Sequence, residues 1–206
     1  MGITMIARSP EKQQRRPGGR RRYALLVAIS TSMASSQLAA LPPATPTGER
    51  MSPRGQRNVT DIVLGDWTKI CFRPGGAKAL CRTSVTGTFA TGQMAIRLDI
   101  ITRQDHGAER IQIFCPVGMY LPNQVELIID ASRPYRVPYT WCMANICIAG
   151  APAPRSLIKE MTTGRMLQLR FVDSSLLQLT VSIPLPTFSS AYSGPASQTF
   201  EQDISE

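Results

Sequence analysis

Apolar and polar residues alternate along much of the chain, which is the period of a β-strand. Residues 93–103 give the clearest example, because every second residue is apolar and these residues share one face of the predicted strand. These positions are Met94, Ile96, Leu98 and Ile100. After the turn sequence Asp105-His106-Gly107, residues 110–114 return with the same period. The two segments therefore predict an antiparallel hairpin.

Further short segments have the composition and spacing of strands. They lie at residues 67–72, 80–85, 125–130, 135–141, 166–172 and 177–185, with a short strand at Ile148. Pro138 interrupts one of them and indicates an edge strand or a bulge. Residues 116–123 contain two prolines and a glycine. We expect a buried crossing loop there instead of a regular strand.

One segment, residues 155–163, has a clear helical period. Leu157, Ile158 and Met161 share one side of it, Pro154 stands at its start, and Gly164 is placed as a C-terminal stop. Residues 188–192 are expected to form a single helical turn that docks on a sheet edge. Many short strands with one short helix predict an all-β fold, either an antiparallel β-sandwich or a small barrel.

The N-terminus has the order of a secretory signal. A positive stretch ends in Arg20-Arg21-Arg22, an apolar run occupies residues 23–29, and small residues follow at 30–36. We expect cleavage near residue 40. The apolar run is shorter than the roughly 20 residues needed to span a bilayer, so no transmembrane anchor is predicted. The paired arginines leave both the general secretory route and the twin-arginine route open.

These patterns divide the chain into four parts. Residues 1–40 are a cleaved signal peptide, and residues 41–60 are a flexible lead-in rich in proline, glycine and polar residues. Residues 61–193 form one β domain. Residues 194–206 lack an apolar period and are expected to be a disordered tail.

The formal net charge of +9 belongs mostly to the signal. Residues 1–40 hold seven Lys/Arg and one Glu, so the remaining chain has sixteen basic and thirteen acidic side chains, a net charge of +3. No basic stripe remains that would contact a phosphate backbone. The sequence therefore predicts no nucleic-acid partner.

All five cysteines lie after the signal, and outside the cytoplasm cysteines persist mainly as disulfides. Cys71 and Cys81 flank one predicted turn, and Cys142 and Cys147 flank another, so proximity favours these two pairs. Two pairs among five cysteines can be chosen in fifteen ways, and the other arrangements stay open. We expect Cys115 to be a buried free thiol, although an intermolecular disulfide or a redox role is an alternative.

The cysteine spacings and a single histidine fit a zinc site poorly, so no metal or cofactor is predicted. His106, the only histidine, lies in an exposed turn where a catalytic base would be neither oriented nor shielded. No nucleophile elbow or phosphate-binding loop is present. Asp99 is expected to face solvent in its strand. Trp67 and Trp141, each close to a cysteine, are expected to pack over the neighbouring disulfide in the core. No catalytic residues are predicted.

Several segments, taken in order, resemble the invasion-associated locus B family. Residues 65–71 with Cys81 resemble its opening, residues 116–122 resemble a Pro-x-Gly-x-x-x-Pro loop, and residues 141–147 resemble a C-x₄-C hairpin. Residues 181–185 and 188–192 resemble its terminal strand and short tail. Together the resemblance covers residues 64–192.

The resemblance implies a small exported bacterial protein with a β-sandwich-like fold and two disulfides. Cys71, Cys81, Cys142 and Cys147 match the family individually as structural positions, whereas Cys115 departs from its pattern. The family's name refers to host-cell invasion, and no catalytic residues transfer from it. We expect a non-enzymatic protein of the periplasm or outer surface that binds a protein partner in the envelope or on a host cell. A periplasmic housekeeping protein and a hydrolase with an unrecognised carboxylate site are the alternatives.

Overall fold

The computed structural model describes residues 50–75, 78–103 and 108–202. All of them belong to one compact unit, Ala44–Glu206. The expected signal peptide and the turn that contains His106 lie outside the described residues.

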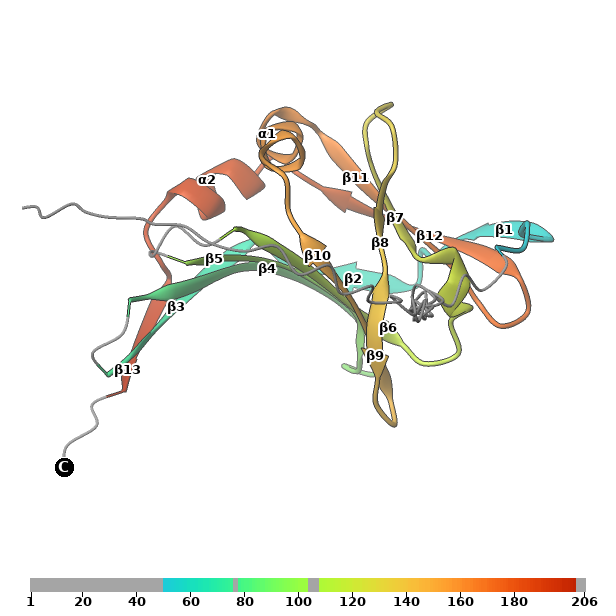
Figure 1. Ribbon diagram of the computed structural model, residues 1–206, viewed down its shortest axis with the longest axis horizontal. Coiled ribbons are helices and arrows are strands. Elements are labelled where there is room, and N and C mark those ends of the chain that lie inside the picture. The colour runs from blue at the N-terminus through green and yellow to red at the C-terminus, as the bar shows by residue number, and fades with distance from the viewer. Residues whose placement is uncertain (1–49, 76–77, 104–107, 203–206) are drawn as a thin grey trace, which may run out of the picture. The chain divides into compact units, whose positions relative to one another are not determined.

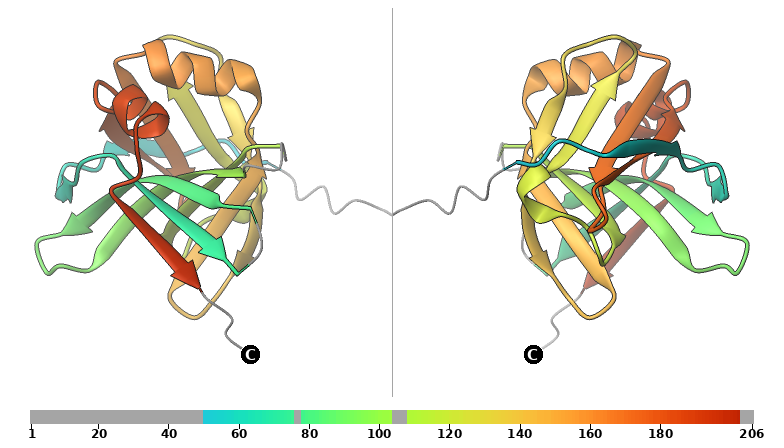
Figure 2. Two further views of the ribbon diagram at one scale, coloured as in Figure 1. Left: turned by 90° about the vertical axis from the view of Figure 1, so that its left-hand side faces the viewer. Right: turned by 90° about the vertical axis from the view of Figure 1, so that its right-hand side faces the viewer.

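Two β-sheets make up this unit, as Figures 1 and 2 show. The larger sheet has the strand order β13-β3-β4-β5-β6-β10-β9, and β2 pairs with β4 beside this path. The smaller sheet has the order β1-β12-β11-β7-β8. The predicted all-β sandwich is confirmed, and the sheets do not close into a barrel.

The strand bounds are as follows. The larger sheet contains β13 (Gln198–Gln202), β3 (Thr68–Pro74), β4 (Leu80–Phe89), β5 (Met94–Arg103), β6 (Arg110–Pro116), β10 (Ile146–Pro152), β9 (Tyr139–Cys142) and β2 (Ile62–Leu64). The smaller sheet contains β1 (Gly55–Asn58), β12 (Leu177–Pro184), β11 (Met166–Val172), β7 (Val125–Ile129) and β8 (Tyr135–Val137).

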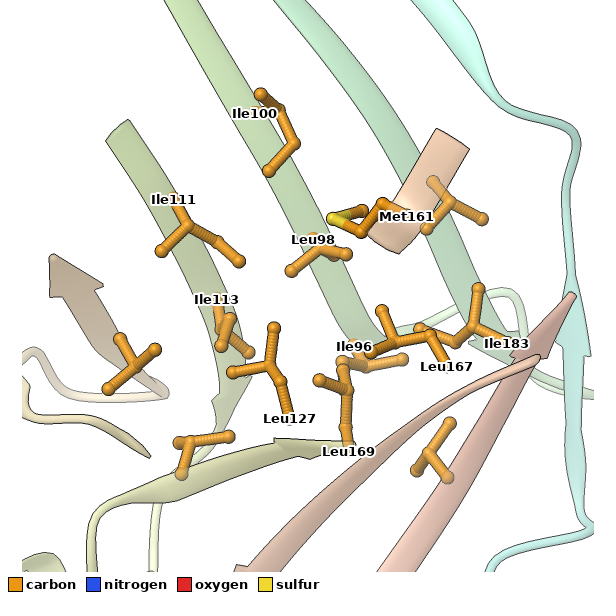
Figure 3. Close-up of a cluster of buried hydrophobic side chains, with 14 of the residues drawn as sticks. Ile96, Leu98, Ile100, Ile111, Ile113, Leu127, Met161, Leu167, Leu169 and Ile183 are labelled. Atoms are coloured by element: carbon orange, nitrogen blue, oxygen red, sulfur yellow. The ribbon is translucent and has the colours of Figure 1, made fainter. Parts of the chain in front are cut away.

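The core lies between the two sheets. The alternation in β5 and β6 turns one row of isoleucines and leucines toward the smaller sheet, which turns its own leucines and isoleucines back toward them (Figure 3). The labelled residues of the figure are Ile96, Leu98, Ile100, Ile111, Ile113, Leu127, Met161, Leu167, Leu169 and Ile183. Burying each such side chain stabilises the fold by about 1.5–3 kcal/mol.

Two short helices complete this core. Helix α1 (Arg155–Thr163) contributes Leu157, Ile158 and Met161, as its spacing predicts, and Gly164 is its C-cap residue. A Cβ at Gly164 would lie 2.8 Å from the carbonyl oxygen of Glu160, so a side chain does not fit there. Helix α2 (Phe188–Ser193) buries Phe188, whose ring meets that of Trp67 edge-on at 4.8 Å.

Both ends of the described unit differ from the prediction. Within the expected flexible lead-in, residues 55–58 form β1, which pairs in parallel with β12. Within the expected disordered tail, residues 198–202 form β13, which pairs in parallel with β3. Each is an edge strand held through backbone hydrogen bonds, so its side chains need no apolar period. These two pairs also make both sheets mixed instead of purely antiparallel.

Two further segments need correction. The single strand expected at residues 135–141 is two strands, β8 in the smaller sheet and β9 in the larger one, with Pro138 between them. The pairing of β9 with β10 also shifts register between Ile148 and Ala149, as a bulge does. The crossing loop at residues 116–123 is not fully buried, because Val117 and Leu121 are exposed. This loop includes a 3₁₀ turn, η1 (Leu121–Asn123).

Candidate functional site

The larger sheet has a second surface, on the side away from the core. Side chains alternate along each strand, so the positions between the core residues of β4, β5, β6 and β10 point to this side. We call this surface the outer face. It carries aromatic and aliphatic side chains as well as arginines, whereas the solvent face of an antiparallel sheet normally carries polar side chains.

One cross-strand row on the outer face ends in an exposed tryptophan. The register places Arg97, Phe114, Ile148 and Trp141 opposite one another on β5, β6, β10 and β9. The Arg97 guanidinium lies over the Phe114 ring at 3.9 Å, a cation–π contact. Ile148 is only 6% exposed, whereas Trp141 is 54% exposed. The row therefore presents a large aromatic surface to solvent next to a packed aliphatic residue.

A second apolar row lies at the other end of the sheet. Phe200, Phe72 and Leu80 are opposite one another on β13, β3 and β4. The two phenylalanine rings stack with centroids 5.3 Å apart, and they are 44% and 41% exposed. Phe200 belongs to a strand that the sequence did not predict.

Asp99 lies between these rows, in the middle of the outer face. Its cross-strand neighbours are Ser84 on β4 and Gln112 on β6. Although it points away from the core, it is only 1% exposed, so the expectation that it faces solvent is wrong. Its Oδ2 atom lies 3.2 Å from Nε of Arg97 and 3.9 Å from Nε of Arg82.

Burial raises the pKa of Asp99 above its usual value, and Arg97, Ser84 and Arg82 offset this only in part. Neither Nε–H group is directed at the carboxylate with hydrogen-bond geometry, although both atoms are buried. An acid–base enzyme of the glycosidase type needs a second carboxylate beside the first and access for substrate. Asp99 is buried and lies beside two guanidinium groups, which suits a structural role beneath the outer face.

Disulfides fix the two hairpins that carry Phe72 and Trp141. The structure joins Cys71 to Cys81 across β3 and β4, and Cys142 to Cys147 across β9 and β10. On the loop-entropy estimate, closing these loops stabilises the fold by about 3 and about 2 kcal/mol respectively. Cys142 directly follows Trp141, so the second bridge anchors the strand that presents the tryptophan.

Cys115 is a free thiol, 3% exposed, and lines the core. It is opposite Cys147 in the register, and its Sγ lies 3.8 Å from the carbonyl oxygen of Cys147. Burial raises the pKa of Cys115 to about 11, with a smaller opposing effect of the Tyr139 hydroxyl. At neutral pH it is therefore a protonated thiol that packs as a small hydrophobe.

A family profile described as "Invasion associated locus B (IalB) protein" matches residues 67–196, more than half of the chain. This chain belongs to the invasion-associated locus B (IalB) family. Among solved structures it is similar to "Crystal structure of invasion associated protein b from bartonella henselae", with a TM-score of 0.54. That match has 15% sequence identity and covers 63% of this chain and 92% of that chain, so it shows a shared fold. No curated protein matches the chain significantly.

The IalB family is not known as an enzyme family. Within the described residues, no three His, Cys, Asp or Glu side chains gather where they would hold a metal ion. None of the helices in the same residues is long and apolar enough to cross a membrane. The two disulfides and the family membership fit a protein that works outside the cytoplasm.

The two tryptophans of this IalB-family chain have opposite surroundings. Trp67 is buried, as predicted, and its Nε1–H donates to the carbonyl oxygen of Pro184 at 2.9 Å. Trp141 lies on an edge strand and is exposed, so its expected place in the core is wrong. Phe72 and Phe114 were missed as surface residues. The sequence could have indicated this position, because in each strand the phenylalanine alternates with the core residues and therefore points to the opposite face.

Proposed function

We propose that this IalB-family chain is an exported, non-enzymatic protein that binds a protein partner through its outer face. The row that ends in Trp141 carries the proposal. Tryptophan and arginine are the residue types that most often dominate the binding energy of protein interfaces. Here Arg97, Phe114 and Trp141 lie in one cross-strand row, and Trp141 belongs to a hairpin that the Cys142–Cys147 disulfide anchors.

Rigid presentation matters because association costs side-chain and loop ordering. Trp141 is paired with Ile148 in the strand register and is followed directly by the bridge at Cys142, so little ordering of the backbone is needed on binding. The stacked Phe72 and Phe200 provide a second apolar area on the same face. A partner that spans the sheet would cover both rows and leave the buried Asp99 centre beneath the interface.

Replacement of Trp141 tests this proposal. We expect Trp141→Ala to weaken capture of the partner by about 30-fold, because truncating an interface hot spot costs about 2 kcal/mol or more. The measurement is capture by the purified protein from cell-envelope extracts and, separately, from host-cell extracts. A saturable partner found in the envelope extract indicates a role in the envelope. One found in the host-cell extract indicates a role in host interaction.

Met166→Ala is the matched control. Met166 is also an exposed apolar residue on a strand, but it lies on β11 of the smaller sheet, away from the outer face. Its replacement should leave capture unchanged. Equal capture by the parent protein and by Trp141→Ala would refute the proposed face, provided that circular dichroism shows both chains to be folded.

A further inference from the structure

The smaller sheet carries a polar cleft on its solvent side. The cleft has a volume of about 220 Å³ and lies over β7, β8, β11 and β12. We call it the arginine cleft, after the three guanidinium groups that line it. Its polar lining residues include Arg50, Asn123, Glu126, Arg136, Arg170 and Gln178.

The strand register determines which charges form the floor of the arginine cleft. Glu126 on β7 lies opposite Arg136 on β8 and, on its other side, opposite Arg170 on β11. Nε of Arg136 is 3.1 Å from Oε1 of Glu126, so these two side chains form an ion pair. Arg170 instead donates from Nη2 to the neutral side chain of Gln168 at 3.2 Å. One carboxylate therefore neutralises only one of the two arginines.

The third guanidinium comes from the segment that precedes β1. The side-chain amide of Asn123 donates to the carbonyl oxygen of Met51 at 2.8 Å, and the backbone amide of Arg54 donates to the carbonyl oxygen of Leu176 at 2.8 Å. These bonds hold the segment at the rim of the cleft, where Arg50 lies. Among the residues that the structure describes, neither Arg50 nor Arg170 forms an ion pair. Three arginines and one glutamate give the lining a net charge of +2.

Among the described residues, the single carboxylate of Glu126 pairs with Arg136 and leaves the other two guanidinium groups of the cleft without a negative partner. A guanidinium presents a planar fork of N–H donors that matches the oxygens of a carboxylate, phosphate or sulfate. The neutral side chains of Ser52, Asn123 and Gln178 add hydrogen-bonding groups to the same lining. We propose that the arginine cleft binds one oxyanion group of an anionic ligand, with Arg170 and Arg50 as its charge partners. The site is on the other sheet from the outer face and does not depend on the proposed partner.

Titration with small anions tests the proposal directly. The purified full chain is titrated with sulfate, inorganic phosphate and glucuronate, at constant ionic strength set with chloride, and the backbone amide NMR spectrum is followed. We expect saturable shifts at Gln124 and Arg170, with a dissociation constant on the order of 1 mM for a few charge-assisted hydrogen bonds. A preference for the first two anions indicates a tetrahedral group as the natural ligand, and a preference for glucuronate indicates a carboxylate.

Three variants make the result specific. Arg170→Gln should weaken binding at least tenfold. Arg50→Gln should also weaken it, and since Arg50 precedes the first strand, this change does not threaten folding. Arg155→Gln removes the same charge on α1 and should leave the affinity unchanged. The proposal is overturned if no anion gives saturable shifts, or if Arg155→Gln weakens binding as much as Arg170→Gln, because the attraction would then be non-specific.

Discussion

The carboxylate of Asp99 is buried and lies near two arginines, but neither Nε–H group forms a hydrogen bond with it. Its folded-state pKa is raised above the reference value of 3.8, mainly by burial. The folded protein therefore binds this proton more tightly than the unfolded chain does. The stability that this proton contributes is fully present below pH 3.8 and is lost as the pH rises through the raised folded-state pKa. Above the raised pKa the buried charge of Asp99 lowers the free energy of unfolding.

Replacing Asp99 with asparagine should remove this pH dependence. We expect Asp99→Asn to be as stable as the parent protein at pH 3 and more stable at pH 7, by about 1 kcal/mol, an ordinary size for a single substitution. Asparagine fills the same space, and Arg82 and Arg97 remain partly hydrated without the charge. The measurement is urea unfolding at a series of pH values from 3 to 8.

Glu201→Gln serves as the control for this experiment. Glu201 also pairs with an arginine, Arg73, at 2.9 Å, but both side chains are more than half exposed. An ion pair of this kind contributes little, so the variant should follow the parent at every pH. If Asp99→Asn instead loses stability at pH 7, pairing with the arginines outweighs burial and the argument is wrong.

Each tryptophan lies close in sequence to a disulfide-bonded cysteine, and yet Trp67 is buried and Trp141 is exposed. Trp67 is buried because α2 places Phe188 against it, a contact between residues far apart in the chain. Trp141 has no such cover because β9 is the last strand of its sheet. The alternation of residues predicts on which face of a strand a side chain lies. It does not predict what covers that face, and this is why Asp99 was also misplaced.

At the scale of elements, the two bridged hairpins explain how short strands hold their positions at or near a sheet edge. Each bridge joins directly paired residues, so it fixes the register of its hairpin. Cys115, on the neighbouring strand β6, remains outside both bridges. The state of these five cysteines can be measured without knowing the partner.

Thiol counting is the test of this arrangement. We expect almost no rapid reaction in the native protein, one reactive thiol after unfolding without reductant, and five after reduction. Cys115 is slow in the native state because it is buried and its pKa is about 11. A Cys115→Ser variant should lower the second count from one to zero. Three or more free thiols in the unfolded, unreduced protein would contradict the two bridges.

The elements that could be predicted are those with long apolar periods or clear end signals. The strands of the β5–β6 hairpin, the helix α1 with Gly164 after it, and the turn at Phe188 follow from local patterns and were confirmed. The edge strands β1 and β13 could not be found in this way. Their sequences, GQRN and QTFEQ, are mostly polar, and they become strands because a neighbouring strand offers free hydrogen-bonding groups.

At the scale of the whole domain, the two sheets present different chemistry to solvent. The outer face of the larger sheet is aromatic with a buried charge centre, whereas the arginine cleft of the smaller sheet is polar and positive. The resemblance of short motifs predicted the family, which the profile over residues 67–196 confirmed. Neither surface was predicted, because each one collects residues from strands that are distant in sequence.

Export is the prediction that concerns the whole chain. Protein recovered from the cell envelope should begin close to residue 41, since residues 1–40 have the order of a secretory signal. N-terminal sequencing of that protein is the measurement. Replacing the apolar run at residues 23–29 with polar residues should leave the intact chain in the cytoplasm. An intact N-terminus on envelope protein would contradict cleavage.

The position of β13 has a practical consequence for anyone who labels this protein. Phe200 lies in β13, the last described strand, and its ring is part of the outer face. A purification tag or fluorophore attached to the C-terminus would follow Phe200 by only a few residues, and one attached to the N-terminus would be lost if the predicted signal is cleaved. Immobilisation through an engineered cysteine on α1, for instance in place of Lys159, keeps the outer face free.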